Sequence, residues 1–195
     1  MEAPKTPKGR TTRKKILDSS IRIINEKGFN NTTLNDMCRS SGVAIGTFYH
    51  YFSSTQDILV EILRIEGEEM SQFSESLEAS SAVEALESML VYQLDYFEKK
   101  GKEIVAHIYT MEISAHHGGA QLLRVLPLMD IITDIIRKAQ TSKELREDLD
   151  LQQCAMLFLS LIFSYSLVWL SSEEHRTLKE IALDHLMIEV ERMKL

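Results

Sequence analysis

The sequence contains few residues that interrupt helices or that could form disulfides. It has three prolines, eight glycines and two cysteines in 195 residues. This shortage of breakers favours helices, and the absence of valine-rich alternating runs argues against a sheet. Cys38 and Cys154 are far apart and neither belongs to a C-x-x-C pair. A disulfide framework is therefore not expected, and a reduced, cytoplasmic setting fits.

Long uninterrupted hydrophobic runs are also missing. The most apolar stretch, 155–170, contains Ser160, Ser164 and Ser166, and it is too short and too hydroxylic to be a good membrane span. The N-terminus lacks the apolar core of a signal peptide. Hydrophobic residues nevertheless make up 44% of the chain, so a packed core is expected over most of its length.

Signatures of catalysis are absent from the sequence. It has no G-x-S-x-G, no phosphate-binding glycine loop and no H-E-x-x-H, so neither an enzyme nor a cofactor is predicted. Glu112 and His116 are four apart on a predicted helix, but no third metal ligand is placed and His117 points elsewhere. We interpret these histidines as residues of a helix end before Gly118, and no metal site is predicted.

Charge is divided unevenly along the chain. The first 60 residues carry nine basic and five acidic side chains, a net charge of +4, and the total of −7 leaves −11 for the remainder. A basic N-terminal part on an acidic body is typical of a nucleic-acid-binding protein with a second, non-binding part. The alternative is that the N-terminal charges are merely solvated.

Apolar residues at helical spacing, interrupted at glycines and polar pairs, predict an all-α chain. Residues 1–10, with Pro4 and Pro7, are expected to form a flexible basic arm. Thr33 is predicted to cap a short helix, with Asp36 in a capping-box relation, and Gly42 to form the turn that follows. The other expected helices are 11–27, 44–51, 56–79, 82–100, 103–117, 120–140, 150–171 and 173–193, with Asp150 and Ser172 as caps of the last two.

The two short helices around Gly42 have the pattern of a helix-turn-helix. Phe48 and Phe52 are four apart, so they share one face and are expected to anchor the second helix in the core. The opposite face is then free to enter a DNA major groove, and Gly46 would let the backbone approach the duplex closely. An aromatic-rich core helix is the alternative interpretation.

These residues make the chain resemble the TetR family of bacterial transcriptional regulators. The resemblance covers about residues 11–60 and rests on Thr33, Leu34, Met37, Cys38, Ser41, Gly42, Val43, Ala44, Gly46, Thr47, Phe48, Tyr49, Tyr51, Phe52, Asp57 and Leu59. It implies a three-helix DNA-binding head, 11–55, followed by a helical ligand-binding and dimerisation body, 56–195.

Each predicted DNA contact has a chemical reason. Tyrosine and threonine hydroxyls suit phosphate oxygens, Thr47 and His50 can donate to base edges, and Ile45 can touch a thymine methyl. The predicted contacts are Thr33, Ala44, Ile45, Gly46, Thr47, Tyr49, His50, Tyr51, Thr55, Lys5, Lys8 and Arg10. The chain departs from the family where Cys38 and Ser41 replace alanines and Thr55 replaces a phosphate-binding lysine. Arm residues, with Arg13 and Lys14 among them, are expected to compensate for the lost lysine.

The resemblance implies a two-fold homodimer formed by the last two helices. Helix 150–171 is apolar nearly all round, which favours burial on both sides. The predicted interface residues are Phe158, Ile162, Tyr165, Trp169, Leu178, Ile181, His185 and Ile188. Burial of all these side chains within one protomer is the alternative.

A small-molecule site is predicted among the middle helices of the body, where the family places it. Residues 89, 92, 93 and 96 share one helix face, and residues 107, 111 and 114 share another. The candidate lining is Met89, Tyr92, Gln93, Tyr96, His107, Met111, Ser114 and Met129. Ordinary core packing is the competing interpretation.

The sequence therefore predicts a ligand-responsive transcriptional regulator, expected to be a repressor. Its partners would be a near-palindromic double-stranded DNA operator, a second copy of itself and an unidentified small organic effector, with no membrane. A constitutive DNA-binding protein without a sensor site is the alternative.

Overall fold

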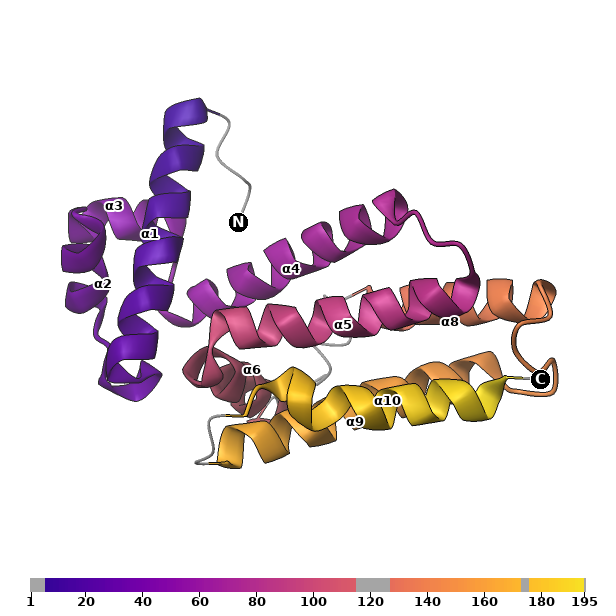
Figure 1. Cartoon of the computed structure of the whole chain (residues 1–195). Helices are drawn as coiled ribbons and strands as arrows, with labels where there is room; N and C mark the ends of the chain where they lie inside the picture. Colours follow the sequence, from indigo (N-terminus) through magenta and orange to yellow (C-terminus); the bar gives the residue numbers. More distant parts are fainter. Residues whose placement is uncertain (1–5, 115–126, 173–175, 195) are drawn as a thin grey trace. The chain divides into compact units, whose positions relative to one another are not determined.

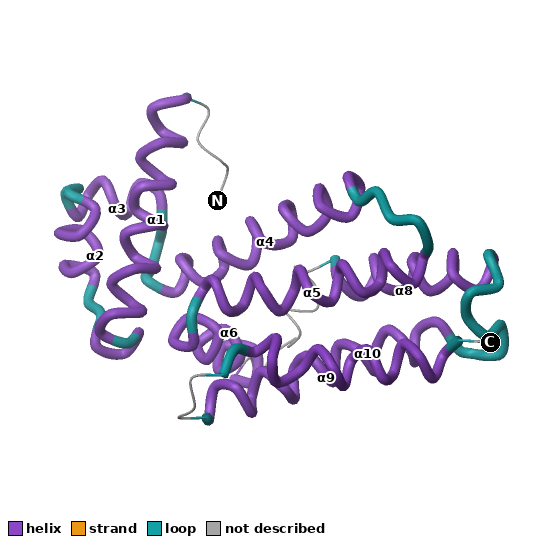
Figure 2. The backbone as a smooth tube through the Cα atoms, viewed as in Figure 1, coloured by secondary structure: helices purple, strands orange, loops and turns teal. Residues whose placement is uncertain are grey.

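The computed structural model describes residues 6–114, 127–172 and 176–194, and most of these residues are helical. No strand occurs among them (Figure 2). The helices, labelled in Figure 1, are α1 Pro7–Lys27, the 3₁₀ turn η1 Phe29–Asn31, α2 Leu34–Ser41, α3 Ile45–Tyr51, α4 Gln56–Ser76, α5 Ala82–Lys100, α6 Lys102–Ser114, α8 Leu128–Thr141, α9 Leu151–Ser171 and α10 Leu178–Met193. The fold is all-α, as the sequence predicts.

The helix boundaries differ from the prediction at several ends. α4 ends at Ser76 rather than at residue 79, and α8 begins at Leu128 after Pro127, whereas the first residues of the predicted helix 120–140 lie outside the described ones. α1 begins at Pro7 rather than Thr11, because the Thr6 side chain accepts a hydrogen bond from the Gly9 N–H (3.1 Å) and proline suits a first helical position. Residues 7–10 are thus helical and do not belong to a flexible arm. α10 begins after Thr177, which forms a capping box with Glu180, and Ser172 is not its cap.

The described helices divide into two compact units. One contains the chain up to Arg64, and therefore α1, α2, α3 and the first half of α4, together with α6. The other begins at Ile65 and contains the second half of α4 with α5, α8, α9 and α10. The predicted border at residue 56 falls earlier than this division, and α6 was expected in the body. We call the two units the head unit and the body unit.

Hydrogen bonds join the ends of helices within the body unit, and two of the acceptors are carboxylates that bind backbone N–H groups at helix starts. The Glu144 carboxylate, between α8 and α9, accepts hydrogen bonds from the backbone N–H groups of Ala82 (3.1 Å) and Val83 (3.0 Å) at the start of α5. At the start of α10, the Lys179 N–H donates to Glu98 (2.6 Å). The chain after α10 returns to the turn before α9, where the Arg146 N–H donates to the Met193 carbonyl (3.0 Å).

α9 is the most apolar helix of the body unit. It begins after Asp150, whose side chain accepts from the Gln153 N–H (2.8 Å), as the sequence predicts. Its length and composition would also allow it to cross a membrane, a property that core helices of soluble proteins share. α9 packs against α8 and α10 within the protomer, and Phe158 and Trp169 are buried there.

Candidate nucleic-acid interface

Two phenylalanines fix the orientation of α3 in the head unit. Phe48 and Phe52 are 0% and 1% exposed, and their ring centroids lie 5.6 Å apart. They pack in a core that also holds Ile16, Ile24 and Met37, all fully buried. The prediction that this face of α3 turns inward is confirmed, and the opposite face must point away from the head's own core.

A capping box begins α2, and a glycine ends it in the turn before α3. Thr33 accepts a hydrogen bond from the Asp36 N–H (3.2 Å), and its own N–H donates to the Asp36 carboxylate (3.1 Å), as predicted. Hydrogen bonds from the Thr33 and Lys27 side chains lower the pKa of Asp36, so this carboxylate also ties α2 to the end of α1. Gly42 ends α2 in the left-handed region, with φ 63°, which glycine adopts at least cost.

The outward face of α3 consists of small, hydroxylic and aromatic side chains. Ile45 is 46% exposed and Tyr49 is 53% exposed. Ala44, Gly46 and His50 are exposed too, and Thr47 and Tyr51 are half-buried. These are the residues predicted to contact DNA. The surface offers hydroxyl groups, an imidazole and an apolar side chain, which suits phosphate and base-edge contacts.

Gly46 leaves open space on that face. A Cβ added to it would meet no atom within 4 Å. We expect Gly46→Ala to leave the free energy of unfolding nearly unchanged, because alanine is the better helix former, while lowering affinity for duplex DNA about tenfold or more by holding the backbone away. Urea unfolding followed by circular dichroism and DNA binding by fluorescence anisotropy measure the two quantities. Unchanged DNA affinity would show that the backbone here does not approach the duplex.

The basic residues of α1 differ in their exposure. Lys8 and Arg10 are exposed in the first turns of α1, and Lys5 lies outside the described residues. Arg13, expected to help bind phosphate, does not remain available. Its guanidinium makes a bidentate pair with the Glu61 carboxylate (Nη2 to Oε2, 2.8 Å) and lies 5.1 Å from the centroid of the Phe52 ring. Arg13 thus joins α1 to α4 behind the recognition helix.

The link between α3 and α4 is ordered by Asp57. Its carboxylate accepts hydrogen bonds from the Ser53 N–H (2.7 Å) and the Ser54 hydroxyl (2.9 Å). Thr55, where the family has lysine, is half-buried within this link. Thr33 and Thr55 therefore lie at the starts of α2 and α4, where backbone N–H groups favour an anion.

α6 packs against the end of α1 in the head unit. The ring centroids of Phe29 and His107 lie 4.5 Å apart, and the Asn25 amide donates to the Lys100 carbonyl (2.8 Å). Gly101, with φ 90°, fits closely here, because an added Cβ would lie 2.7 Å from Asn25 Oδ1. His107, predicted to line a ligand site, thus contacts the head, and Met111 follows it on α6.

The other predicted ligand residues belong mainly to the body unit. Met89, Gln93 and Tyr96 of α5 are buried, at 0%, 1% and 6% exposed, and Tyr92 beside them is half-buried. Met129 is half-buried on α8, whereas the side chain of Ser114 lies outside the described residues. The sequence interpretation missed Glu66 of α4, which is fully buried and accepts a hydrogen bond from Gln93 (2.8 Å). Glutamate is seldom fully buried, so its residue type gave no sign of this position.

The predicted dimer residues fall into two classes. Phe158, Ile162, Trp169, Leu178 and Ile181 are at most 9% exposed, because they form the contacts of α9 and α10 within one protomer. Those five assignments are corrected, since such side chains cannot face a partner. His185 and Ile188 are exposed, and the half-buried Tyr165 stacks on His185 with ring centroids 5.2 Å apart.

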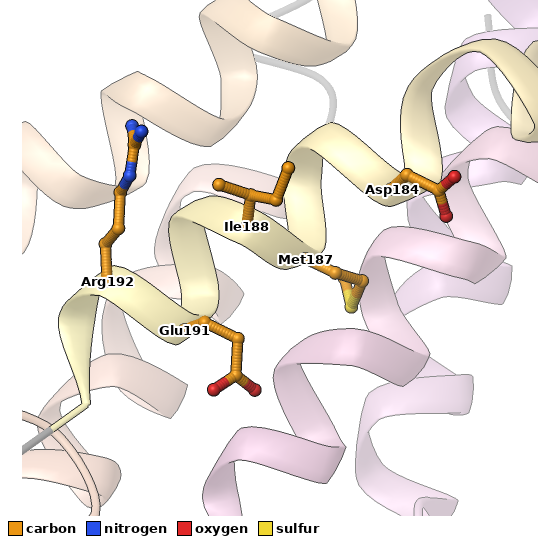
Figure 3. A pocket seen from close by; sticks show the side chains of 5 residues that line it. All are labelled: Asp184, Met187, Ile188, Glu191 and Arg192. Atoms are coloured by element: carbon orange, nitrogen blue, oxygen red, sulfur yellow. The ribbon is translucent and has the colours of Figure 1, made fainter.

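The exposed face of α10 carries a shallow depression. It is lined by Asp184, Met187, Ile188, Glu191 and Arg192, whose side chains Figure 3 shows projecting from successive turns of the one helix. On α9 the exposed large apolar side chains are Met156, Leu157, Leu167 and Val168. Among the described residues, no group of three or more His, Cys, Asp or Glu side chains is placed to hold a metal ion. His116 and His117 lie outside the described residues, and so does the side chain of Glu112.

Comparison with known proteins agrees with this geometry. The sequence profile of the family described as "Bacterial regulatory proteins, tetR family" matches residues 16–62, which span α1 to the first half of α4. The fatty acid metabolism regulator protein of Bacillus subtilis is 25% identical over 183 residues, covering 90% of this chain and 91% of its own. Its name, like those of the other curated relatives, is that of a regulator and not of an enzyme.

Solved structures of similar fold cover nearly the whole chain. FadR of Thermus thermophilus, a TetR-family repressor in complex with lauroyl-CoA, superposes with a TM-score of 0.67 at 20% identity, covering 94% of this chain and 95% of its own. GusR of Salmonella enterica superposes with a TM-score of 0.74 at 19% identity, covering 98% and 99%. The helix-turn-helix, its capping residues and these likenesses lead to one conclusion: residues 16–62 form a DNA-binding domain of the TetR family of bacterial transcriptional regulators, and the chain as a whole is similar to regulators of that family.

Proposed function

We propose that the chain is a ligand-responsive repressor that binds a near-palindromic operator as a homodimer in the cytoplasm. The observation that carries this proposal is the outward face of α3, where exposed Tyr49 and His50 surround the open surface at Gly46. Since Phe48 and Phe52 hold the opposite face in the core, α3 has one side to offer to a major groove. Lys8 and Arg10 of α1 supply positive charge in the same unit.

A second copy of the chain is the occupant that we assign to the exposed apolar face of α9. Met156, Leu157, Leu167 and Val168 are 39–50% exposed. They recur at spacings of three and four with Ser160 and Ser164 between them, so they form one stripe along the helix. Ile188 of α10, 47% exposed, adds to the apolar surface. A stripe of this kind on a soluble protein favours helix–helix association, and a two-fold axis would pair it with itself.

Release of the operator is assigned to a small organic molecule bound in the body unit. The FadR structure similar to this chain holds lauroyl-CoA, which supports a ligand site in this fold. A ligand that binds one body conformation more tightly than another shifts the protein between operator-binding and released states. A constitutive DNA-binding protein remains the second candidate, and it would require that no small molecule change operator affinity.

Selection of binding sites from random duplex DNA tests the proposal. We expect the full chain to enrich a sequence with two inverted half-sites. Tyr49→Ala should weaken binding to the selected and to shuffled sequences alike, because a phenol hydroxyl contacts phosphate. His50→Ala should instead relax the preference at one position of each half-site. Equal loss on all sequences from both substitutions, or no enriched sequence at all, would contradict the proposed role of α3.

A further inference from the structure

A polar and aromatic cluster joins α4 and α5 inside the body unit. We define the α4–α5 cluster as Glu66, Met70 and Phe73 of α4 with Tyr92, Gln93 and Tyr96 of α5. The three residues on each helix follow one another at spacings of one, three or four, so each set lies on one helix face. Glu66 and Met70 are 0% exposed and Gln93 is 1% exposed. A carboxyl group and an amide are thus placed where a core would normally hold apolar atoms.

The polar pair at the base of the cluster leaves an acceptor unused. Gln93 Nε2 donates to Glu66 Oε1 at 2.8 Å, which turns the amide oxygen of Gln93 away from the carboxyl group. That oxygen, Gln93 Oε1, is buried and has no hydrogen-bond partner among the described residues. A buried acceptor without a donor is costly to the folded protein, and a bound group carrying N–H donors would relieve the cost.

Aromatic rings extend from this polar base toward the surface. The Phe73 and Tyr92 rings stack with centroids 4.6 Å apart, and Tyr92 and Tyr96 lie 6.4 Å apart. Phe73 and Tyr92 are half-buried, whereas Tyr96 is 6% exposed. Burial, and then the charges of Glu66 and Glu69, raise the pKa of Tyr96, so its phenol stays neutral. Neutral aromatic faces beside carboxyl groups attract a cation.

We propose that the α4–α5 cluster is the effector site and that the effector is an aromatic organic cation with N–H donors. This inference rests on the proposed function. The cation would donate hydrogen bonds to Gln93 Oε1 and to the Glu66 carboxyl, and its ring would pack on Phe73 and Tyr92. The phosphates of an acyl-CoA, the ligand of the FadR structure, would meet Glu66 and Glu69 with like charge. The cluster therefore selects a ligand of opposite charge.

Three probes of one shape test the charge preference on the full-length protein. We would use 4-phenylbenzamidine as the cation, 4-phenylbenzamide as its neutral analogue and 4-phenylbenzoate as the anion. Isothermal titration calorimetry should show the cation binding about tenfold or more tightly than the amide, and the benzoate weakest. Glu66→Gln, nearly isosteric, should reduce the cation's advantage over the amide to about twofold or less. Glu75→Gln, an exposed residue of the same helix, is the matched control and should keep the advantage.

A second variant and a DNA readout make the test decisive. Gln93→Met is the alternative variant if Glu66→Gln fails to fold. It keeps the side-chain length and removes the open acceptor, so it should weaken cation binding. In the wild-type chain 4-phenylbenzamidine should release selected operator DNA. If the chain without ligand binds DNA but the cation binds no better than the amide, or binds without releasing DNA, this inference is wrong and the proposed function stands. If the chain without ligand selects no DNA sequence, the proposed function itself fails.

Discussion

The substitution Val168→Glu is expected to convert the protein to a monomer and to lower operator affinity about 10²-fold or more. Val168 is 50% exposed at the C-terminal end of the α9 stripe, so a charge placed there would be buried against the partner's stripe in the proposed dimer. Loss of the dimer removes the gain that two linked recognition helices have over one. Sedimentation velocity measures the oligomeric state, and fluorescence anisotropy with the selected operator measures the affinity.

Thr141→Glu is the matched control for this prediction. Thr141 is exposed at the end of α8, outside the α9 stripe, so the same added charge should leave both the dimer and operator affinity as they are. A Val168→Glu chain that still sediments as a dimer would show that the subunits meet elsewhere. The dimer interface would then have to lie on other helices.

Removal of the Glu61 carboxylate is expected to destabilise the head unit by about 3–5 kcal/mol at neutral pH. Glu61 is 5% exposed and pairs with Arg13 and with Arg64 (2.8 Å). Glu61→Ala leaves the Arg13 guanidinium enclosed without its counter-charge, directly behind Phe52, so operator affinity should fall with the stability. Urea unfolding followed by circular dichroism gives the free energy. Glu75→Ala, at an exposed position of α4, should change it by less than about 0.5 kcal/mol.

The same ion pair predicts how the difference between wild type and variant depends on pH. Burial acts to raise the pKa of Glu61, but hydrogen bonds from Arg64 and Arg13 outweigh it, and the pKa lies below its ordinary value of 4.5. A lowered folded-state pKa means that the ionised carboxylate stabilises the fold at pH values above 4.5 and that this contribution is lost as the pH falls through the folded-state pKa. The wild-type advantage over Glu61→Ala should therefore shrink on acidification below pH 4.5. An advantage that grows in acid would exclude the ion pair as its cause.

Local signals explain why the helix-turn-helix was predictable from sequence. The capping residues Thr33 and Asp36 and the left-handed Gly42 fix α2 through contacts within a few residues. The spacing of Phe48 and Phe52 alone determines which face of α3 is buried. The same kind of signal located Asp150 at the start of α9. These features depend on neighbours in the chain and not on the tertiary arrangement.

Contacts between distant segments could not be derived in the same way. Arg13 looks like any basic residue near an N-terminus, and only the fold brings Glu61 to it. Glu66 lies on an acidic helix, where solvent exposure is the default expectation, and only the packing of α5 against α4 buries it with Gln93. For α9, whose sequence is apolar on every side, periodicity cannot separate the side chains that face α8 and α10 from those left outward, so Phe158 and Trp169 were assigned to the wrong face.

Hydroxyl-radical footprinting of the full chain on its selected operator tests the central claim most directly. If α3 of each protomer enters the major groove in a two-fold dimer, protection should fall in two equal patches whose centres are roughly 34–36 Å, or about one helical turn, apart or a multiple of it. The DNA backbone nearest Gly46 should be the most strongly protected. A single patch, or uniform protection without a centre of symmetry, would contradict operator binding by the two α3 helices of a dimer.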